Sequence, residues 1–126
     1  MAEQLVVSEL ESIIAEKQGK SRGRWYGAFD VMAWLNVLAE FSHELQLELR
    51  YEDDKGPNQI MIDRAGFSSN PLMLLSNRLS VAFVGAVTQA SLWVTSEGEF
   101  KTGVLEARLS PARVSAHQYL NAERAA

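Results

Sequence analysis

The sequence predicts a single α+β domain in which helices pack mainly on one face of an antiparallel or mixed sheet. The first observation is a change of hydrophobic period. Apolar residues recur at helical spacing over residues 31–41 and then alternate strictly with polar ones over residues 45–51. The second observation is a pair of turn signals, at residues 53–58 and 96–99, each lying between segments with strand character. We therefore expect about four to five strands built from two hairpins, with N-terminal helices and a C-terminal helix.

The first part of the chain is expected to form two helices. The first runs from about Glu3 to Gln18, because apolar residues share one helical stripe and Lys17 near its end suits the helix dipole. Gly19 is a natural residue to end this helix. The second helix runs from Asp30, a suitable N-cap residue, to about His43. A short strand is possible just before it, from Trp25 to Phe29.

The segment from Leu45 to Glu52 is expected to be a half-buried strand. One long helix is the alternative, but it would stack Glu40, Glu44 and Glu48 at i,i+4 spacing, where like charges repel. A strand instead places its apolar residues on one side and its charges on the other. The segment from Gln59 to Arg64 would then return antiparallel, through a loop longer than two residues.

The second half of the chain is less regular. Asn70-Pro71 can begin a helix, and residues 81–87 are fully apolar, so residues 71–87 are compatible with either helix or strand. Residues 88–95 and 100–109 alternate and predict a second hairpin around the turn at residues 96–99. A final helix is expected from Ser110-Pro111 to about Ala122.

Composition is that of an ordinary globular protein. The 126 residues fit one compact domain, residues 1–126, with a net charge of −4 that disfavours bulk electrostatic binding of nucleic acid. There is no cysteine, which excludes disulfides and thiolate metal sites and fits a reducing cytoplasm. The acidic N-terminus lacks the basic region of a signal peptide, so a cytoplasmic protein is expected.

Motifs for catalysis are missing from the sequence. His43 and His117 are the only histidines, and a metal site usually needs three ligands. The sequence contains neither a nucleophile elbow nor a glycine-rich phosphate loop. We therefore expect no enzymatic activity, no catalytic residues, no metal and no cofactor. A pocket without a motif, with His43, Asp63 or glutamate residues converging on it, is the alternative in which the protein is an enzyme or binds a small ligand.

The leading functional hypothesis is a regulatory module that binds another protein and forms a homo-oligomer, in the simplest case a homodimer. Its expected surface combines an acidic ridge, residues 40–54, with an exposed Trp93. The ridge contains a single cation, Arg50. The residues expected to contact the partner are Glu40, Glu44, Glu48, Asp53, Asp54 and Trp93.

The alternative hypothesis is a nucleic-acid-binding accessory protein that uses the basic and aromatic segment at residues 17–26. Cations in this segment can hold phosphates while aromatic rings stack on unpaired bases. The residues expected to take part are Lys20, Arg22, Arg24, Trp25 and Tyr26.

One segment follows the order of a glycine, an amphipathic helix, a strand, a turn, a second strand and a closing glycine. The residues in this order are Gly27, Leu35, Leu38, Leu47, Leu49, Ile60, Ile62 and Gly66. In this order the segment resembles the PATAN-type domains attached to bacterial response regulators. The resemblance covers about a third of the chain. It implies a signalling or interaction module without catalytic activity, and it assigns no site residues.

Overall fold

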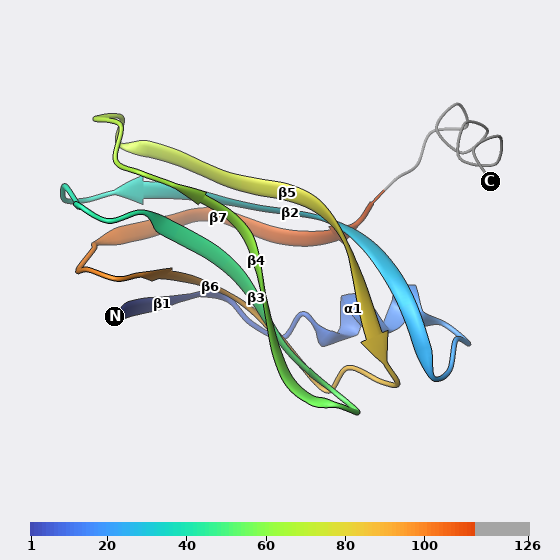
Figure 1. Ribbon diagram of the computed structural model, residues 1–126. Helices are drawn as coiled ribbons and strands as arrows, with labels where there is room; N and C mark the ends of the chain where they lie inside the picture. Colours follow the sequence, from blue (N-terminus) through green and yellow to red (C-terminus); the bar gives the residue numbers. More distant parts are fainter. Residues whose placement is uncertain (113–126) are drawn as a thin grey trace, which may run out of the picture.

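The computed structural model describes residues 1–112 and shows two antiparallel sheets packed as a sandwich (Figure 1). Sheet A has the strand order β1-β6-β3-β4, and sheet B has the order β5-β2-β7. The elements are β1 (Ala2–Val7), α1 (Glu11–Gln18), β2 (Arg24–Val37), β3 (Leu45–Asp53), β4 (Gly56–Ala65), β5 (Leu72–Val84), β6 (Gln89–Ser96) and β7 (Thr102–Pro111). The predicted α+β class is therefore wrong, because strands dominate the described residues and α1 is short.

The largest correction concerns the predicted helix from Asp30 to His43. Residues 30–37 belong to β2, the central strand of sheet B, and they alternate between the core and the outer face. Phe29, Val31 and Leu35 point into the core, whereas Met32 and Trp34 lie on the other side of the strand. The two outward apolar residues fill the gaps in the alternating pattern and thereby imitate helical spacing.

The predicted first helix divides into a strand and a shorter helix. Residues 2–7 pair with β6 as an edge strand of sheet A, and α1 begins only at Glu11. Glu9 separates the two elements with a φ of 60°, a left-handed conformation that interrupts regular structure. The predicted end of the helix is confirmed: Gly19 follows Gln18 with a φ of 54°, and its N–H donates to Ala15 O.

The strand predicted from Leu45 and the antiparallel return after it are confirmed as β3 and β4. All odd-numbered residues of β3 are buried and all even-numbered ones are half-buried. The connecting loop is shorter than expected, because Asp53 pairs with Gly56 and only Asp54 and Lys55 lie between them. Gly56 has a φ of 103°, which is costly for any residue with a Cβ, so glycine permits this tight turn.

The second half of the chain differs from expectation at three places. Residues 72–84 form one strand, β5, and Asn70 Oδ1 accepts a hydrogen bond from Leu72 N in a turn rather than beginning a helix. The predicted second hairpin is absent from the described part of the chain, since β6 pairs within sheet A and β7 pairs with β2 in sheet B. The predicted helix after Pro111 lies outside the described residues, although Ser110 and Pro111 themselves end β7.

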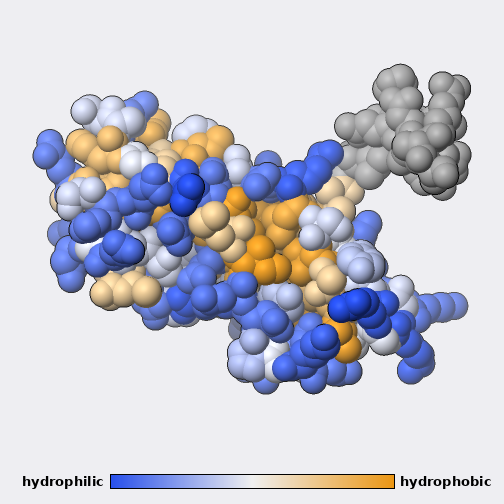
Figure 2. Space-filling view, in the orientation of Figure 1, coloured by the Kyte–Doolittle hydropathy of each residue, from blue (hydrophilic) through white to orange (hydrophobic). Residues whose placement is uncertain are grey.

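The core lies between the two sheets and centres on Phe83 of β5. Its ring stacks on Trp25 at a centroid distance of 4.6 Å and meets the edges of Phe29 and Tyr51 at 6.3 and 5.0 Å. Because Tyr51 belongs to sheet A and the other three rings to sheet B, this cluster holds the two layers together. Figure 2 shows hydrophobic side chains reaching the surface over the region where β4 and β5 lie in Figure 1.

Side chains link the edges of the two sheets. Asp63 Oδ2 on β4 accepts a hydrogen bond from Ser76 N on β5 at 2.9 Å, and Asn77 Nδ2 donates to Ile62 O at 3.0 Å. At the opposite edge Thr102 Oγ1 of β7 donates to Gln4 Oε1 of β1 at 2.8 Å. These bonds connect strands that belong to different sheets, and they leave the outer faces of both sheets uncovered.

Candidate functional site

The outer face of sheet A carries a pair formed by Arg50 and Trp93. β3 and β6 are neighbouring strands, and the side chains at even positions of β3 and odd positions of β6 point away from the core. The guanidinium carbon of Arg50 lies 4.4 Å from the centre of the Trp93 ring, within the range of a cation–π contact. Trp93 Nε1 donates a hydrogen bond to Ser91 Oγ at 2.9 Å, which fixes the orientation of the ring.

Two carboxylates hold Arg50 in this position. Arg50 Nη2 donates to Glu3 Oε2 at 2.6 Å and to Glu48 Oε1 at 2.8 Å, and Arg50 Nε also donates to Glu48 Oε1 at 3.1 Å. The hydrogen bond from Arg50 lowers the pKa of the Glu3 carboxyl below its ordinary value, and the same bond raises the pKa of Arg50. The cation is thus positioned by strands β1 and β3 before any partner arrives.

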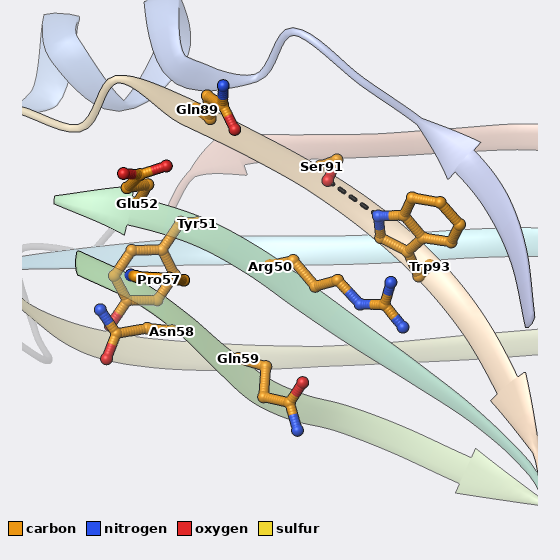
Figure 3. Close-up of a pocket in the computed structure, with 9 residues that line it drawn as sticks. All are labelled: Arg50, Tyr51, Glu52, Pro57, Asn58, Gln59, Gln89, Ser91 and Trp93. Atoms are coloured by element: carbon orange, nitrogen blue, oxygen red, sulfur yellow. Dashed lines mark hydrogen bonds between the residues drawn. The ribbon is translucent and has the colours of Figure 1, made fainter.

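Beside this pair the surface is hollowed, as Figure 3 shows. The hollow has a volume of about 410 Å³ and is lined by Arg50, Tyr51, Glu52, Pro57, Asn58, Gln59, Gln89, Ser91 and Trp93. Three of these side chains are amides, which both donate and accept hydrogen bonds. The Glu52 carboxylate has no ion-pair partner among the cations of residues 1–112.

The hollow thus combines apolar and polar groups, and negative charge prevails around it. Glu3, Glu48 and Glu52 bring three carboxylates to its surroundings, against the guanidinium of Arg50; Arg64, on β4, pairs with Glu44 instead. Since Arg50 is already engaged by two of these carboxylates, Glu52 supplies the free charge. Such a surface favours a ligand that offers a cation together with hydrogen-bonding groups, and it repels anions.

The structure distributes the residues of the predicted acidic ridge over several separate places. Glu48 lies directly across from Trp93, and Glu44 at the start of β3 forms an exposed pair with Arg64 at 3.6 Å. Glu40 is exposed in the connection between β2 and β3. Asp54 lies at the far end of β3, roughly 30 Å along the strand from Glu44. The six predicted residues do not form one continuous surface.

Asp53, one of the predicted contact residues, points into the fold. Its side chain is 9 % exposed, and Oδ1 accepts hydrogen bonds from Lys55 N at 2.9 Å and from Asn58 Nδ2 at 3.4 Å. Oδ2 accepts a hydrogen bond from Val84 N at 3.0 Å. The contacts of Asp53 thus connect the β3–β4 turn to the end of β5.

The basic segment occupies the end of the sandwich near α1. Lys20, Arg22, Arg24 and Tyr26 are exposed, but Trp25 is 5 % exposed and donates from Nε1 to Gly85 O at 2.9 Å. Asp54 lines the same hollow as Lys20 and Arg22, which brings an acid of the predicted ridge to the predicted cationic segment. The two charged regions are therefore not separate poles of the molecule.

Sequence reasoning did not identify Arg50 as a central residue of this face. Its partner Glu3 lies 47 positions earlier in the chain, and only the pairing of β1 with β6 and of β6 with β3 brings the two together. The available signal was that Arg50 is the single cation within a strongly acidic stretch.

Other kinds of site find little support in the described part of the chain. No three side chains among His, Asp and Glu converge there as a metal site needs. His43 lines a hollow of about 380 Å³ together with Glu44 and Glu97, whereas Asp63 bonds to the backbone of β5 and does not line it. No helix within residues 1–112 has the length and apolar character required to cross a membrane.

Comparisons of the chain with protein-family models, with curated proteins and with solved structures gave no match. The resemblance to PATAN-type domains is not supported by the fold either, because the amphipathic helix that it requires after Gly27 is strand β2.

Proposed function

We propose that this protein is a binding module that captures a basic segment of another protein on the outer face of sheet A. The observation that supports it is the Arg50–Trp93 pair, which Glu3 and Glu48 hold in place. It lies beside a hollow in which the Glu52 carboxylate forms no ion pair with any cation of residues 1–112. Tryptophan and arginine are the residues that most often dominate binding energy at protein interfaces.

The partner segment is expected to be extended and to carry at least one lysine or arginine. Its cation would reach Glu52, while its peptide groups bond to the amides of Asn58, Gln59 and Gln89. Because Arg50 is already fixed, little side-chain entropy is lost at the centre of the contact. Of the predicted contact residues, Glu48 and Trp93 belong to this surface. We place the protein in the cytoplasm, in keeping with its lack of cysteine.

Synthetic peptides provide the direct test. Extended peptides rich in lysine and arginine, and matched peptides with glutamate or glutamine at the same positions, are titrated against the labelled protein and followed by NMR chemical shifts. We expect binding of the basic peptides only, with affinity that falls as salt rises. Glu52→Gln and Trp93→Ala should each weaken binding about tenfold or more, which corresponds to ~1.4 kcal/mol.

Glu97→Gln is the matched control, because Glu97 is an exposed acid in the β6–β7 turn and does not line the hollow. It should leave the affinity unchanged. Equal binding of basic peptides to the Glu52→Gln variant, or equal binding of the glutamine peptides to the wild type, would rule out the proposed site.

Nucleic-acid binding is the second candidate, and one observation supports it. Arg24 and Tyr26 lie two residues apart on the outer face of sheet B, and both are exposed, Tyr26 to 67 %. A cation next to an open aromatic ring suits an unpaired nucleotide. With Trp25 in the core, stacking would depend on Tyr26 alone. This candidate predicts that single-stranded RNA or DNA binds at low salt and that the double variant Arg24→Ala plus Tyr26→Ala no longer binds it. If the wild type binds no oligonucleotide at low salt, this candidate is excluded.

A further inference from the structure

The outer face of sheet B carries a ridge of large, mostly apolar side chains that crosses all three strands. Leu74 of β5, Trp34 of β2 and Glu106 of β7 lie opposite one another and point away from the core. A bulge in β7 leaves Leu105 beside Glu106, so that both oppose Trp34. Leu74 is 42 % exposed and Leu105 57 % exposed. The result is a hydrophobic ridge on a face that no described element covers.

Next to this ridge lies a hollow. The adjacent row across the sheet consists of Ser76, Met32 and Arg108, in which small Ser76 follows large Leu74 along β5. These residues line a hollow of about 420 Å³, and Leu74 forms part of its wall. A ridge and a hollow in neighbouring rows are what a surface needs in order to pack against itself.

The charges on this face balance. Four ionised side chains lie on this face among residues 30–36 of β2 and the residues of β5 and β7 that pair with them. They are two acids, Asp30 and Glu106, and two bases, Arg78 and Arg108. Arg78 donates to both Asp30 oxygens, at 2.7 and 3.2 Å. The chain as a whole has a net charge of −4, so this neutral face can approach its own copy without the repulsion that the acidic face of sheet A would produce.

We propose that a second copy of this chain covers the outer face of sheet B, related by a two-fold axis that runs across the strands between the two rows. This operation places Leu74 opposite Ser76, Trp34 opposite Met32, and Glu106 opposite Arg108, each contact occurring twice. The first pair fills the hollow, and the second brings a methionine sulfur to an indole ring. The third adds a contact between the copies to the exposed pair that Arg108 and Glu106 form within each chain at 3.9 Å. The proposal concerns a different sheet from the peptide site and does not depend on it.

The face is at the small end of the sizes that dimers use. β7 pairs only with residues 29–37 of β2, and the two-fold axis overlaps the same nine residues with their copies. Three strands about 4.8 Å apart therefore give a shared surface of roughly 14 by 30 Å, or about 400 Å² on each copy before the relief of the side chains is added. Specific interfaces bury roughly 600 to 1,000 Å² on each partner.

Sedimentation velocity tests the proposal. The wild type should sediment as a dimer of the 14.0 kDa chain at micromolar concentration. Leu74→Glu should make it a monomer, because it introduces a charge into the ridge. Arg108→Glu should weaken the dimer at least tenfold by placing like charges opposite each other, and the double variant Glu106→Arg with Arg108→Glu should restore it by exchanging the charges on both copies.

Met61→Glu is the matched control, since Met61 is 52 % exposed on the opposite sheet, and it should leave the dimer intact. Far-UV circular dichroism confirms that each variant keeps its strands. A wild type that stays monomeric up to about 100 μM, a scale at which micromolar dimers are fully formed, would overturn the proposal. A dimer that survives Leu74→Glu would do the same, and so would a double charge exchange that fails to restore association.

Discussion

Asp53 Oδ2 accepts a hydrogen bond from the backbone N–H of Val84 at 3.0 Å, and this bond joins the tip of the β3–β4 hairpin in sheet A to the end of β5 in sheet B. The backbone reinforces the connection, because Asp54 N donates to Val84 O at 3.0 Å. A side chain first interpreted as a partner contact therefore stabilises the fold.

Replacing Asp53 is expected to destabilise the protein. Asp53→Ala leaves the N–H groups of Lys55 and Val84 without their acceptor, and the free energy of unfolding should fall by roughly 1–3 kcal/mol. Asp54→Ala is the neighbouring control: its side chain is exposed, and the change should stay within about 0.5 kcal/mol. Urea denaturation followed by tryptophan fluorescence measures both. Equal values for the two variants would contradict the structural role of Asp53.

Gly27 should be sensitive to the smallest substitution. A Cβ at this position would lie 2.7 Å from Phe29 Cε2 and 3.2 Å from Trp25 Cζ3, so Gly27→Ala must displace two core rings. Overpacking of this kind costs roughly 1–3 kcal/mol. Gly66→Ala is the control, because a Cβ there meets nothing within 4 Å. Thermal unfolding should show a clearly lower midpoint for Gly27→Ala alone, and similar midpoints for both variants would count against the packing described.

The ion pair between Arg50 and Glu3 predicts a specific pH dependence. Because its hydrogen bond with Arg50 lowers the pKa of Glu3 in the folded state, the pair contributes stability above the ordinary glutamate pKa, and this contribution is lost as pH falls through the lowered value. Arg50→Gln should return the pKa of Glu3 to its ordinary range, which an NMR titration of the carboxyl resonance measures. Arg64→Gln, which removes a cation from the Glu44 pair instead, should leave the pKa of Glu3 unchanged.

The parts of the fold that could be predicted are those in which one hydrophobic period is undisturbed. Apolar and polar residues alternate without exception in β3 from Leu45 to Glu52, and its pairing with β4 follows from the turn residues between them. β2 was misjudged because Met32 and Trp34, on the outward side, are as apolar as their core-facing neighbours. A strand with two apolar faces has no clear period of 2, and the pattern then resembles a helix.

Pairing between distant strands explains the remaining errors. The apolar residues of β1 also fit the helical stripe that continues into α1, so the pattern predicts one helix. The left-handed Glu9 between the two elements leaves no mark in the sequence. β6 and β7 were expected to form a hairpin, yet their turn at residues 97–101 leads from one sheet to the other. For the site, the outward positions of Glu48 and Trp93 could be inferred from alternation, whereas Glu3 and Arg50 meet only through β6.

Phe83 is the residue on which the contact between the sheets most depends. Phe83→Ala removes a fully buried ring that touches Trp25, Phe29 and Tyr51, and the free energy of unfolding should fall by roughly 3–5 kcal/mol. Such a loss is a large part of the total stability of a domain of this size. Phe83→Leu retains most of the volume and should cost less.

A second measurement on the same variants separates lost packing from general unfolding. Burial raises the pKa of the Tyr51 hydroxyl above its ordinary value, with a smaller contribution from the charge of Asp53. This raised pKa adds stability that is present below the ordinary tyrosine pKa and is lost as pH rises through the folded value. Phe83→Ala should admit water to the ring and lower the pKa of Tyr51, whereas Phe83→Leu should keep it raised. Ultraviolet titration of the tyrosines, at pH values below that of unfolding, measures the pKa of Tyr51. An unchanged pKa of Tyr51 in a folded Phe83→Ala variant would show that Phe83 does not exclude water from the contact between the two sheets.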